Sequence, residues 1–185
     1  KKTDERMEEN VHYISMAIPN EEVRVIFKNT VLSWFEQKIS KKDLTPLYKS
    51  ILEGRCEDFE TVVSQMLREG ISFYDTKESF YHGFLMGLLN GLEDYYAFSN
   101  RESGLGRYDI CLKSMEADKP AVLMELKVAA GYGELEERSS QALQQILEKE
   151  YERELVWEGY REVLCYGIAF YKKSCRIKLE KHKLS

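Results

Sequence analysis

The run Ala121-Val-Leu-Met-Glu-Leu-Lys-Val128 is the most informative stretch of the sequence. Apart from its two charged residues it is continuously apolar, which is typical of an interior β-strand. Residues two apart on a strand point to the same face, so Glu125 and Lys127 are predicted to project side by side. Two charges on a buried strand are costly unless they pair with each other or bind a metal ion.

Asp109 is a second isolated acid, inside the mostly apolar segment Arg107-Tyr-Asp-Ile-Cys-Leu112. If residues 114–120 connect the two segments as a hairpin, Asp109 and Glu125 lie across from one another. Facing carboxylates repel unless a cation lies between them, and Mg²⁺ prefers such oxygen ligands. The spacing is compatible with a divalent-metal site in which Lys127 stabilises a phosphate. On spacing alone, it favours a structural ion pair or an edge strand with one wet face.

The elements around these two strands predict an α/β fold, a mixed sheet flanked by helices. Short β-type runs bounded by turn residues predict strands over residues 95–101, 107–113, 121–128, 162–170 and 175–179. Helical periodicity predicts helices over residues 77–93 and 135–157. The glycines of the first helix are spaced by four, which predicts a ridge where the sheet backbone comes close; they are Gly83, Gly87 and Gly91.

The first 75 residues predict a small helical section behind a lead-in strand. The strand is expected over residues 13–18, and helices over residues 21–37, 46–53 and 57–69. Gly54 and Gly70 are credible helix ends. Because no low-complexity linker separates this section from the rest, we expect it to pack on the domain formed by residues 76–185.

The formal net charge of −5 is unevenly distributed. Residues 133–162 hold nine acids and four bases, whereas residues 171–185 hold six bases and one acid. An acidic helix beside a basic C-terminal strand is compatible with phosphate binding, and equally with an ordinary solvated surface.

Several classes of protein find little support in the sequence. No run approaches the about 18 apolar residues of a membrane span. The four cysteines form no Cys-x-x-Cys pair, which favours buried reduced thiols in a cytoplasmic protein. The sequence contains no Gly-x-Ser-x-Gly motif and no cysteine in an activated setting, so serine and cysteine hydrolysis have little support. The chain does not begin with Met, and we expect it to be a fragment of a longer protein.

Five blocks occur in a characteristic order. They are Glu78-Ser-Phe-Tyr-His-Gly-Phe-Leu85, Ser99-Asn-Arg-Glu-Ser-Gly-Leu-Gly-Arg-Tyr-Asp109, Glu125-Leu-Lys127, Ala142-Leu-Gln-Gln-Ile146 and Cys165-Tyr-Gly-Ile-Ala-Phe170. Together they resemble the PD-(D/E)XK nuclease superfamily, and within it the bacterial group whose nuclease domain follows an AAA-ATPase-like domain. The likeness covers residue 76 to the end and, less specifically, the helical section before it. It implies a restriction-endonuclease-like fold.

The resemblance implies roles for individual residues. Asp109 and Glu125 match the metal-binding acids, and Lys127 matches the catalytic lysine. Glu78 matches an acid that some members place on the first core helix as a further metal ligand, although the helix dipole also favours an acid there. Gln145 matches a glutamine used near the site by RecB-like members, although a solvated helix position is an alternative. Tyr108 stands where many members have Pro.

Other polar residues near these blocks are weaker candidates. His82 shares a helix face with Glu78 and is expected to bond it, to contact DNA or to be a structural histidine. Arg101 and Arg107 flank the loop before Asp109, where they either meet phosphates or are simply solvated. Tyr151 is an aromatic at a spacing that is more typical of the core.

The resemblance implies a Mg²⁺- or Mn²⁺-dependent nuclease whose expected substrate is DNA. The alternative is a catalytically weak or inactive module of the same fold that binds nucleic acid or a partner protein. The resemblance also implies an AAA-ATPase-like domain. Because these 185 residues contain no phosphate-binding loop, any such domain is expected upstream in the same chain. A homo-oligomer stays open.

Overall fold

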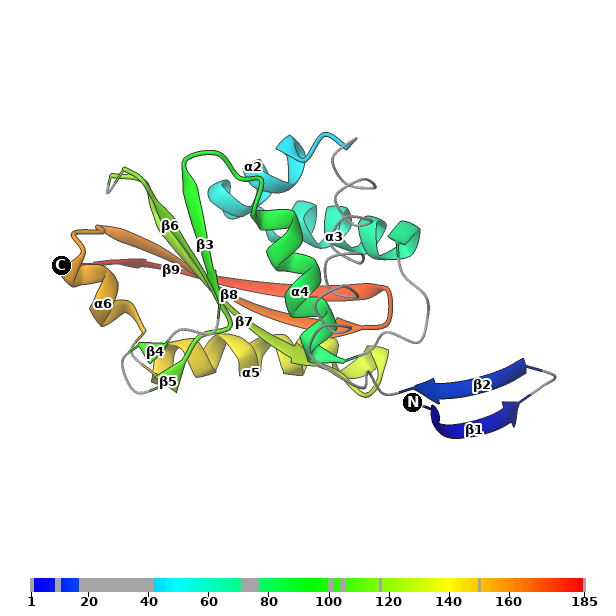
Figure 1. Cartoon of the computed structure of the whole chain (residues 1–185). Coiled ribbons are helices and arrows are strands. Elements are labelled where there is room, and N and C mark those ends of the chain that lie inside the picture. The colour runs from blue at the N-terminus through cyan, green and yellow to red at the C-terminus, as the bar shows by residue number, and fades with distance from the viewer. Residues whose placement is uncertain are drawn as a thin grey trace. The chain divides into compact units, whose positions relative to one another are not determined.

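The computed structural model describes residues 2–8, 11–16, 42–70, 77–99, 102–103, 106–116, 118–149 and 151–184. The chain divides into two compact units, Lys1–Lys42 and Asp43–Ser185. In the first unit, β1 (Lys2–Glu8) and β2 (Val11–Met16) form an antiparallel hairpin (Figure 1). The sequence predicted a strand that overlaps β2 and did not predict β1. The helix predicted over residues 21–37 lies outside the described residues.

The second unit is built on a five-stranded mixed sheet, as predicted. Its strands are β3 (Tyr95–Ser99), β6 (Ile110–Ser114), β7 (Ala121–Val128), β8 (Glu162–Tyr171) and β9 (Ser174–Lys183), in that spatial order. Only β7 and β8 are parallel, while the other neighbours are antiparallel. The segment before β6 adds a two-residue ladder between β4 (Glu102–Ser103) and β5 (Gly106–Arg107).

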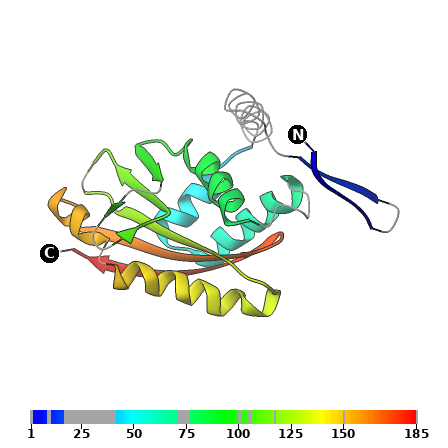
Figure 2. The ribbon, with the colours of Figure 1, turned by 60° about the horizontal axis from the view of Figure 1, so that its bottom comes forward.

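Helices cover both faces of this sheet (Figure 2). On one side lie α2 (Thr45–Glu53), α3 (Cys56–Gly70) and α4 (Glu78–Leu89). On the other side lies α5 (Leu135–Glu148), which follows the short 3₁₀ turn η1 (Tyr132–Glu134) and belongs to the crossover that joins parallel strands β7 and β8. The predicted end of α2 is confirmed, because Gly54 caps it in the left-handed conformation with φ of 78°.

The long helix predicted over residues 135–157 is wrong, because α5 ends at Glu148 and α6 spans Glu152–Trp157. Between them Tyr151 is buried, edge-on to Tyr108 with ring centroids 5.9 Å apart. The sequence contains no Pro or Gly at this point, so propensity gives no indication of the break. The tertiary packing of the Tyr151 ring therefore outweighs the local helical periodicity of the sequence.

The predicted glycine ridge on α4 is not found at Gly83 or at Gly91. Gly83 is exposed, with no described atom within 4 Å of the position its Cβ would take, and Gly91 follows the end of the helix. Larger side chains of α4 fill the sheet contact instead, and those fully or almost fully buried include Tyr81, Leu85 and Leu88. The close backbone approach occurs elsewhere, at Gly167 of β8.

Two bases of the C-terminal strand β9 pair with acids of the flanking helices. Arg176 of β9 bridges Glu60 of α3 at 3.0 Å and Glu136 of α5 at 3.3 Å. Lys178 reaches the same Glu136 at 2.7 Å. These partners indicate that the charge asymmetry between the two segments helps to hold helices against the sheet edge. Within the described residues, no helix has the length and apolar character needed to cross a membrane.

Candidate active site

The two charged residues of β7 project toward the face covered by α5. Glu125 is 3% exposed, and its Oε1 accepts a hydrogen bond from the Lys127 Nζ at 3.0 Å. The Lys127 side chain is 28% exposed, so its ammonium still reaches solvent. The predicted same-face arrangement of this pair is therefore present, and it combines a buried acid with an accessible base.

Asp109 lies just before β6, at the point where the ladder with β7 ends. The last paired residues are Ile110 and Met124, and one further step of this register sets Asp109 opposite Glu125. The Asp109 Oδ2 accepts a hydrogen bond from the Leu126 backbone N–H at 2.8 Å. The carboxylate thus takes the place that a strand carbonyl would occupy, which fixes it beside the middle of β7.

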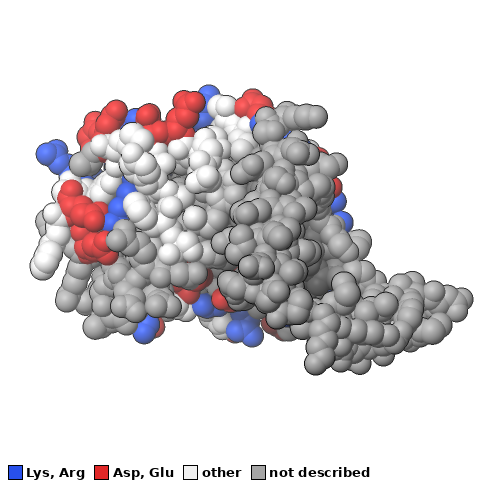
Figure 3. Space-filling view, viewed as in Figure 1, with Lys and Arg blue, Asp and Glu red and all other residues white. Residues whose placement is uncertain are grey.

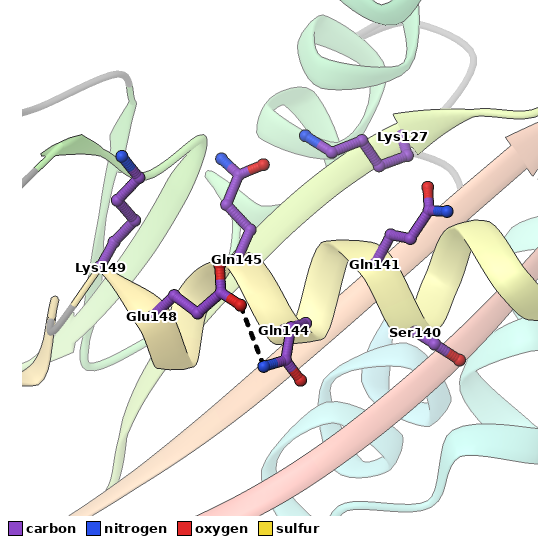
Figure 4. Close-up of a pocket in the computed structure, with 7 residues that line it drawn as sticks. All are labelled: Lys127, Ser140, Gln141, Gln144, Gln145, Glu148 and Lys149. Carbon is purple, nitrogen blue, oxygen red and sulfur yellow. Dashed lines mark hydrogen bonds between the residues drawn. The ribbon is translucent and has the colours of Figure 1, made fainter.

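Gly167 explains how α5 reaches this site. It is the parallel partner of Glu125 on β8. A Cβ at Gly167 would collide with the backbone of Ser139 and Leu143, so only glycine permits this approach. The close packing brings Gln145 to Glu125, where its Nε2 donates to Oε1 at 2.5 Å. Figure 4 shows Gln145 and Lys127 extending from α5 and β7 on the same side of that helix.

The Glu125 carboxyl group is only half satisfied. Lys127 and Gln145 both donate to Oε1, whereas Oε2 is buried without a hydrogen-bond partner among the described residues. Burial raises the pKa of Glu125 to about 7, and the charges of Asp109 and Glu78 add to the rise against the opposing effect of Lys127. A buried, unpartnered oxygen beside a second carboxylate fits a divalent cation, whose charge would remove both penalties.

Glu78 is the outlying member of the predicted set. It is exposed in the first turn of α4 and acts on Glu125 through its charge. Among the described residues, no group of three or more His, Cys, Asp or Glu side chains is close enough to hold a metal ion. The structure therefore brings Asp109, Glu125, Lys127 and Gln145 together and leaves Glu78 at longer range.

Tyr151 belongs both to the core and to the site. It is buried in the same cluster as Tyr108 and Ile146. Its hydroxyl hydrogen-bonds the Gln145 side chain, and burial raises its pKa, with the charges of Glu125 and Asp109 in the same direction. Hydrogen bonds thus link Tyr151 to Gln145, and Gln145 to Glu125.

His82 contacts the site in a way the sequence did not predict. Its Nε2 lies 3.1 Å from the Asp109 carbonyl oxygen and 3.0 Å from the Ser99 hydroxyl. As an N–H donor to that carbonyl, His82 ties α4 to the segment carrying the acid. These partners support the structural histidine that was one of the alternatives from the sequence. Arg101 and the side chain of Arg107 lie outside the described part of the structure.

Comparison with known protein families agrees with this arrangement. Residues 76–180, more than half of the chain, match the family model of the PD-(D/E)XK nuclease superfamily. The chain belongs to this superfamily. No curated protein matches it. The mixed sheet flanked by helices is consistent with the restriction-endonuclease-like fold of PD-(D/E)XK nucleases, which generally use divalent metal ions.

Cysteine chemistry finds no support in this PD-(D/E)XK chain. Burial raises the pKa of Cys111 and of Cys175 to about 12. Such thiols stay protonated at neutral pH and are poor nucleophiles.

Proposed function

We propose that this chain is a divalent-metal-dependent nuclease that hydrolyses phosphodiester bonds in DNA. The observation that carries the proposal is the buried Glu125, with one unpartnered oxygen, beside Asp109 and an accessible Lys127. A purely structural carboxylate at this depth would have both oxygens satisfied. Membership of the PD-(D/E)XK superfamily supports the same conclusion.

In this proposal Asp109 and Glu125 hold Mg²⁺ or Mn²⁺, each through the oxygen that the protein leaves available. Asp109 uses Oδ2 for the Leu126 N–H, and Glu125 uses Oε1 for Lys127 and Gln145. Asp109 and Glu125 are the residues that would hold the cation, and Oε2 of Glu125 has no hydrogen-bond partner among the described residues. When bound, the cation would supply Lewis acidity and lower the pKa of a coordinated water. Glu78 is an outlying acidic residue near these two acids.

Lys127 acts on the substrate itself. Its ammonium attracts the scissile phosphate and stabilises the negative charge that develops on it. Gln145 orients Glu125, and Tyr151 in turn orients Gln145. These roles require a rigid frame, and the parallel pairing of β7 with β8 provides it.

The proposal extends to the domain organisation and the cellular location of the protein. We infer that residues 76–185 form the nuclease core, that residues 1–75 lead into it from an upstream AAA-ATPase-like domain, and that the protein acts on DNA in a bacterial cytoplasm. The five ordered blocks of sequence support this association.

A nuclease-fold module that binds without cleaving is the second candidate. The specific observation in its favour is that no three metal-ligating side chains group together among the described residues. Mg²⁺, however, is commonly held by one or two carboxylates and keeps several waters, so a two-acid site is sufficient. The intact set of two acids and a lysine favours catalysis.

The test is a cleavage assay with supercoiled plasmid, linear duplex, single-stranded DNA and RNA in Mg²⁺, Mn²⁺ or EDTA. We expect DNA cleavage with either metal and none in EDTA. Asp109→Asn should be folded and inactive, since an amide oxygen still accepts from Leu126. Asp118→Asn, an exposed acid in the loop before β7, is the matched control and should stay active. Binding without cleavage in every metal would favour the second candidate, and cleavage of RNA alone would refute the DNA assignment.

A further inference from the structure

A groove lined by polar and charged residues runs along α5 from the candidate site. It has a volume of about 690 Å³ and is lined by Lys127, Ser140, Gln141, Gln144, Gln145, Glu148 and Lys149. In Figure 4 the side chains of Gln145 and Lys149 extend from α5 to the side on which Lys127 lies. One end of the groove is thus the catalytic lysine proposed above.

The lining of this groove differs from the rest of the helix that forms it. It contains three glutamine amides, two lysines and one carboxylate, Glu148, which accepts a hydrogen bond from Gln144 at 3.1 Å. The other acids of α5 do not line it. Glu136 is engaged by Arg176 and Lys178 of β9, and Glu137 accepts from Gln141 at 2.9 Å. An acidic helix therefore presents a face without excess negative charge beside the site.

Three of the lining residues form a single ridge. Gln141, Gln145 and Lys149 are spaced by four, so they lie above one another on α5 and extend over about 12 Å. Gln145 is already bonded to Glu125. The Lys149 ammonium has no carboxylate partner within the part of the chain that the structure describes. The ridge therefore contacts the reacting centre through its middle residue and ends at an available cation.

We propose that this groove binds the phosphodiester backbone of one nucleic-acid strand beside the scissile bond. Lys149 contacts a phosphate, and the amides of Gln141 and Gln144 donate hydrogen bonds to phosphate or sugar oxygens. The location of the groove relative to catalysis rests on the proposed function. Binding itself is measurable without hydrolysis, so the two proposals fail separately.

The composition of the groove makes its binding weakly dependent on salt. Affinity falls with salt in proportion to the number of phosphates that cations neutralise, with a slope of about −0.7 per contact for a single strand. Two lysines predict a slope of about −1.4 for log affinity against log salt concentration. On the face seen in Figure 3, the described acidic and basic side chains are interspersed and form no broad basic patch.

The experiment measures fluorescence anisotropy of labelled 15-nucleotide dT and rU strands in EDTA, where hydrolysis is absent. Lys149→Ala should weaken binding and reduce the salt slope by about 0.7. Gln144→Glu should weaken binding about fivefold or more by placing a carboxylate beside a phosphate. The dT and rU arms show whether the groove distinguishes DNA from RNA. Equal losses of affinity for both strands support recognition of the shared backbone, while no loss of affinity for either strand would refute it.

The chain offers matched controls for both substitutions. Gln65 of α3 hydrogen-bonds Glu69 four residues later, as Gln144 does Glu148, so Gln65→Glu makes the same change away from the groove. Lys49→Ala removes an exposed helical lysine on α2. Lys149 also lies at the C-terminal end of α5, where a cation stabilises the helix dipole. A purely structural role would lower the melting temperature and leave the salt slope unchanged.

The outcomes separate clearly. Groove variants that lose affinity relative to their controls support the inference, even if the wild-type chain cleaves nothing in Mg²⁺. Groove variants that bind both strands within twofold of their controls overturn it, even if the wild-type chain cleaves DNA. A lowered melting temperature with an unchanged slope for Lys149→Ala also overturns the phosphate contact.

Discussion

Two clusters of charge lie on the same face of the sheet and are built in opposite ways. The anchor cluster is Lys113 of β6 with Glu154 and Glu158, whose oxygens lie 2.9 and 2.7 Å from its Nζ. The site cluster is Asp109, Glu125 and Lys127, with Gln145. In the anchor cluster a buried base has two acids, each partly open to water. In the site cluster the buried group is an acid, and a second acid lies beside it.

The pKa shifts of the two clusters express this difference. Burial by itself lowers the pKa of Lys113, but its hydrogen bonds to Glu158 and Glu154 outweigh this effect, so the pKa is raised and the charge is secure. Burial raises the pKa of Glu125 to about 7, and Lys127 does not compensate. The anchor cluster is satisfied by its own side chains. The site cluster is left with an electrostatic cost, which is typical of a functional site.

The largest expected effect separates the two lysines by activity. Lys127→Met should reduce the single-turnover rate of DNA cleavage about 10³-fold, roughly 4 kcal/mol, because the charge that stabilises the phosphate is lost. Lys113→Met should leave the rate within a few-fold of wild type. Circular dichroism of both variants checks that they fold. A Lys127→Met protein that keeps a tenth of the activity would remove this lysine from the mechanism.

The next effect concerns the stability of the metal-free protein. The carboxyl group of Glu125 has an ordinary pKa of 4.5, against about 7 in the fold. Below pH 4.5 it is neutral in both states and costs nothing; between pH 4.5 and 7 only the unfolded chain ionises, so stability falls with rising pH. Above pH 7 the full cost is present, at most about 3 kcal/mol.

Glu125→Gln removes this titration, so its stability relative to wild type should rise by about 2 kcal/mol between pH 4 and pH 8 in EDTA. Urea unfolding at the two pH values measures the difference. Gln65→Glu, remote from the site, is not expected to show a rise of this kind. A constant difference between Glu125→Gln and wild type at both pH values would mean that Glu125 is not held at an electrostatic cost.

A smaller effect tests the anchor cluster. Lys113→Met should lower the free energy of unfolding by about 1–3 kcal/mol, since two carboxylates lose their partner but remain partly hydrated. The m-value should be unchanged, as measured by urea unfolding at pH 7. Lys127→Met removes the hydrogen bond to one carboxylate, that of Glu125, instead of two, and should change the free energy of unfolding less. If both substitutions cost the same, the contrast between a structural and a functional lysine is wrong.

Much of the sheet, and the placement of Glu125 and Lys127 on it, was predictable from sequence because both depend on period-two spacing. The apolar run of β7 gave its bounds correctly, and Glu125 and Lys127 share a face as their spacing requires. The hairpin between β6 and β7 brought Asp109 beside them. These features follow from local rules, which apply within one strand and the hairpin that joins it to its neighbour.

The remaining features depend on contacts between segments far apart in sequence. Tyr151 interrupts the long helix because its ring packs on Tyr108, which no local pattern encodes. Gly167 admits α5 to the sheet and thereby places Gln145, yet in the sequence it is one glycine in an apolar run. The bond from His82 to the Asp109 carbonyl likewise requires the packing of α4 on the loop before β6. Such features follow from the tertiary fold.

Glu78 gives the smallest expected effect on activity and the sharpest test of where the site cluster ends. It is exposed and acts on Glu125 through its charge, so Glu78→Gln should reduce the cleavage rate about tenfold, roughly 1.4 kcal/mol, far less than Asp109→Asn. Glu93→Gln, another exposed acid of this unit, serves as the control. A loss as large as that of Asp109→Asn would show that Glu78 becomes a metal ligand when the cation binds. No loss at all would confine the cluster to the residues of β7, α5 and the start of β6.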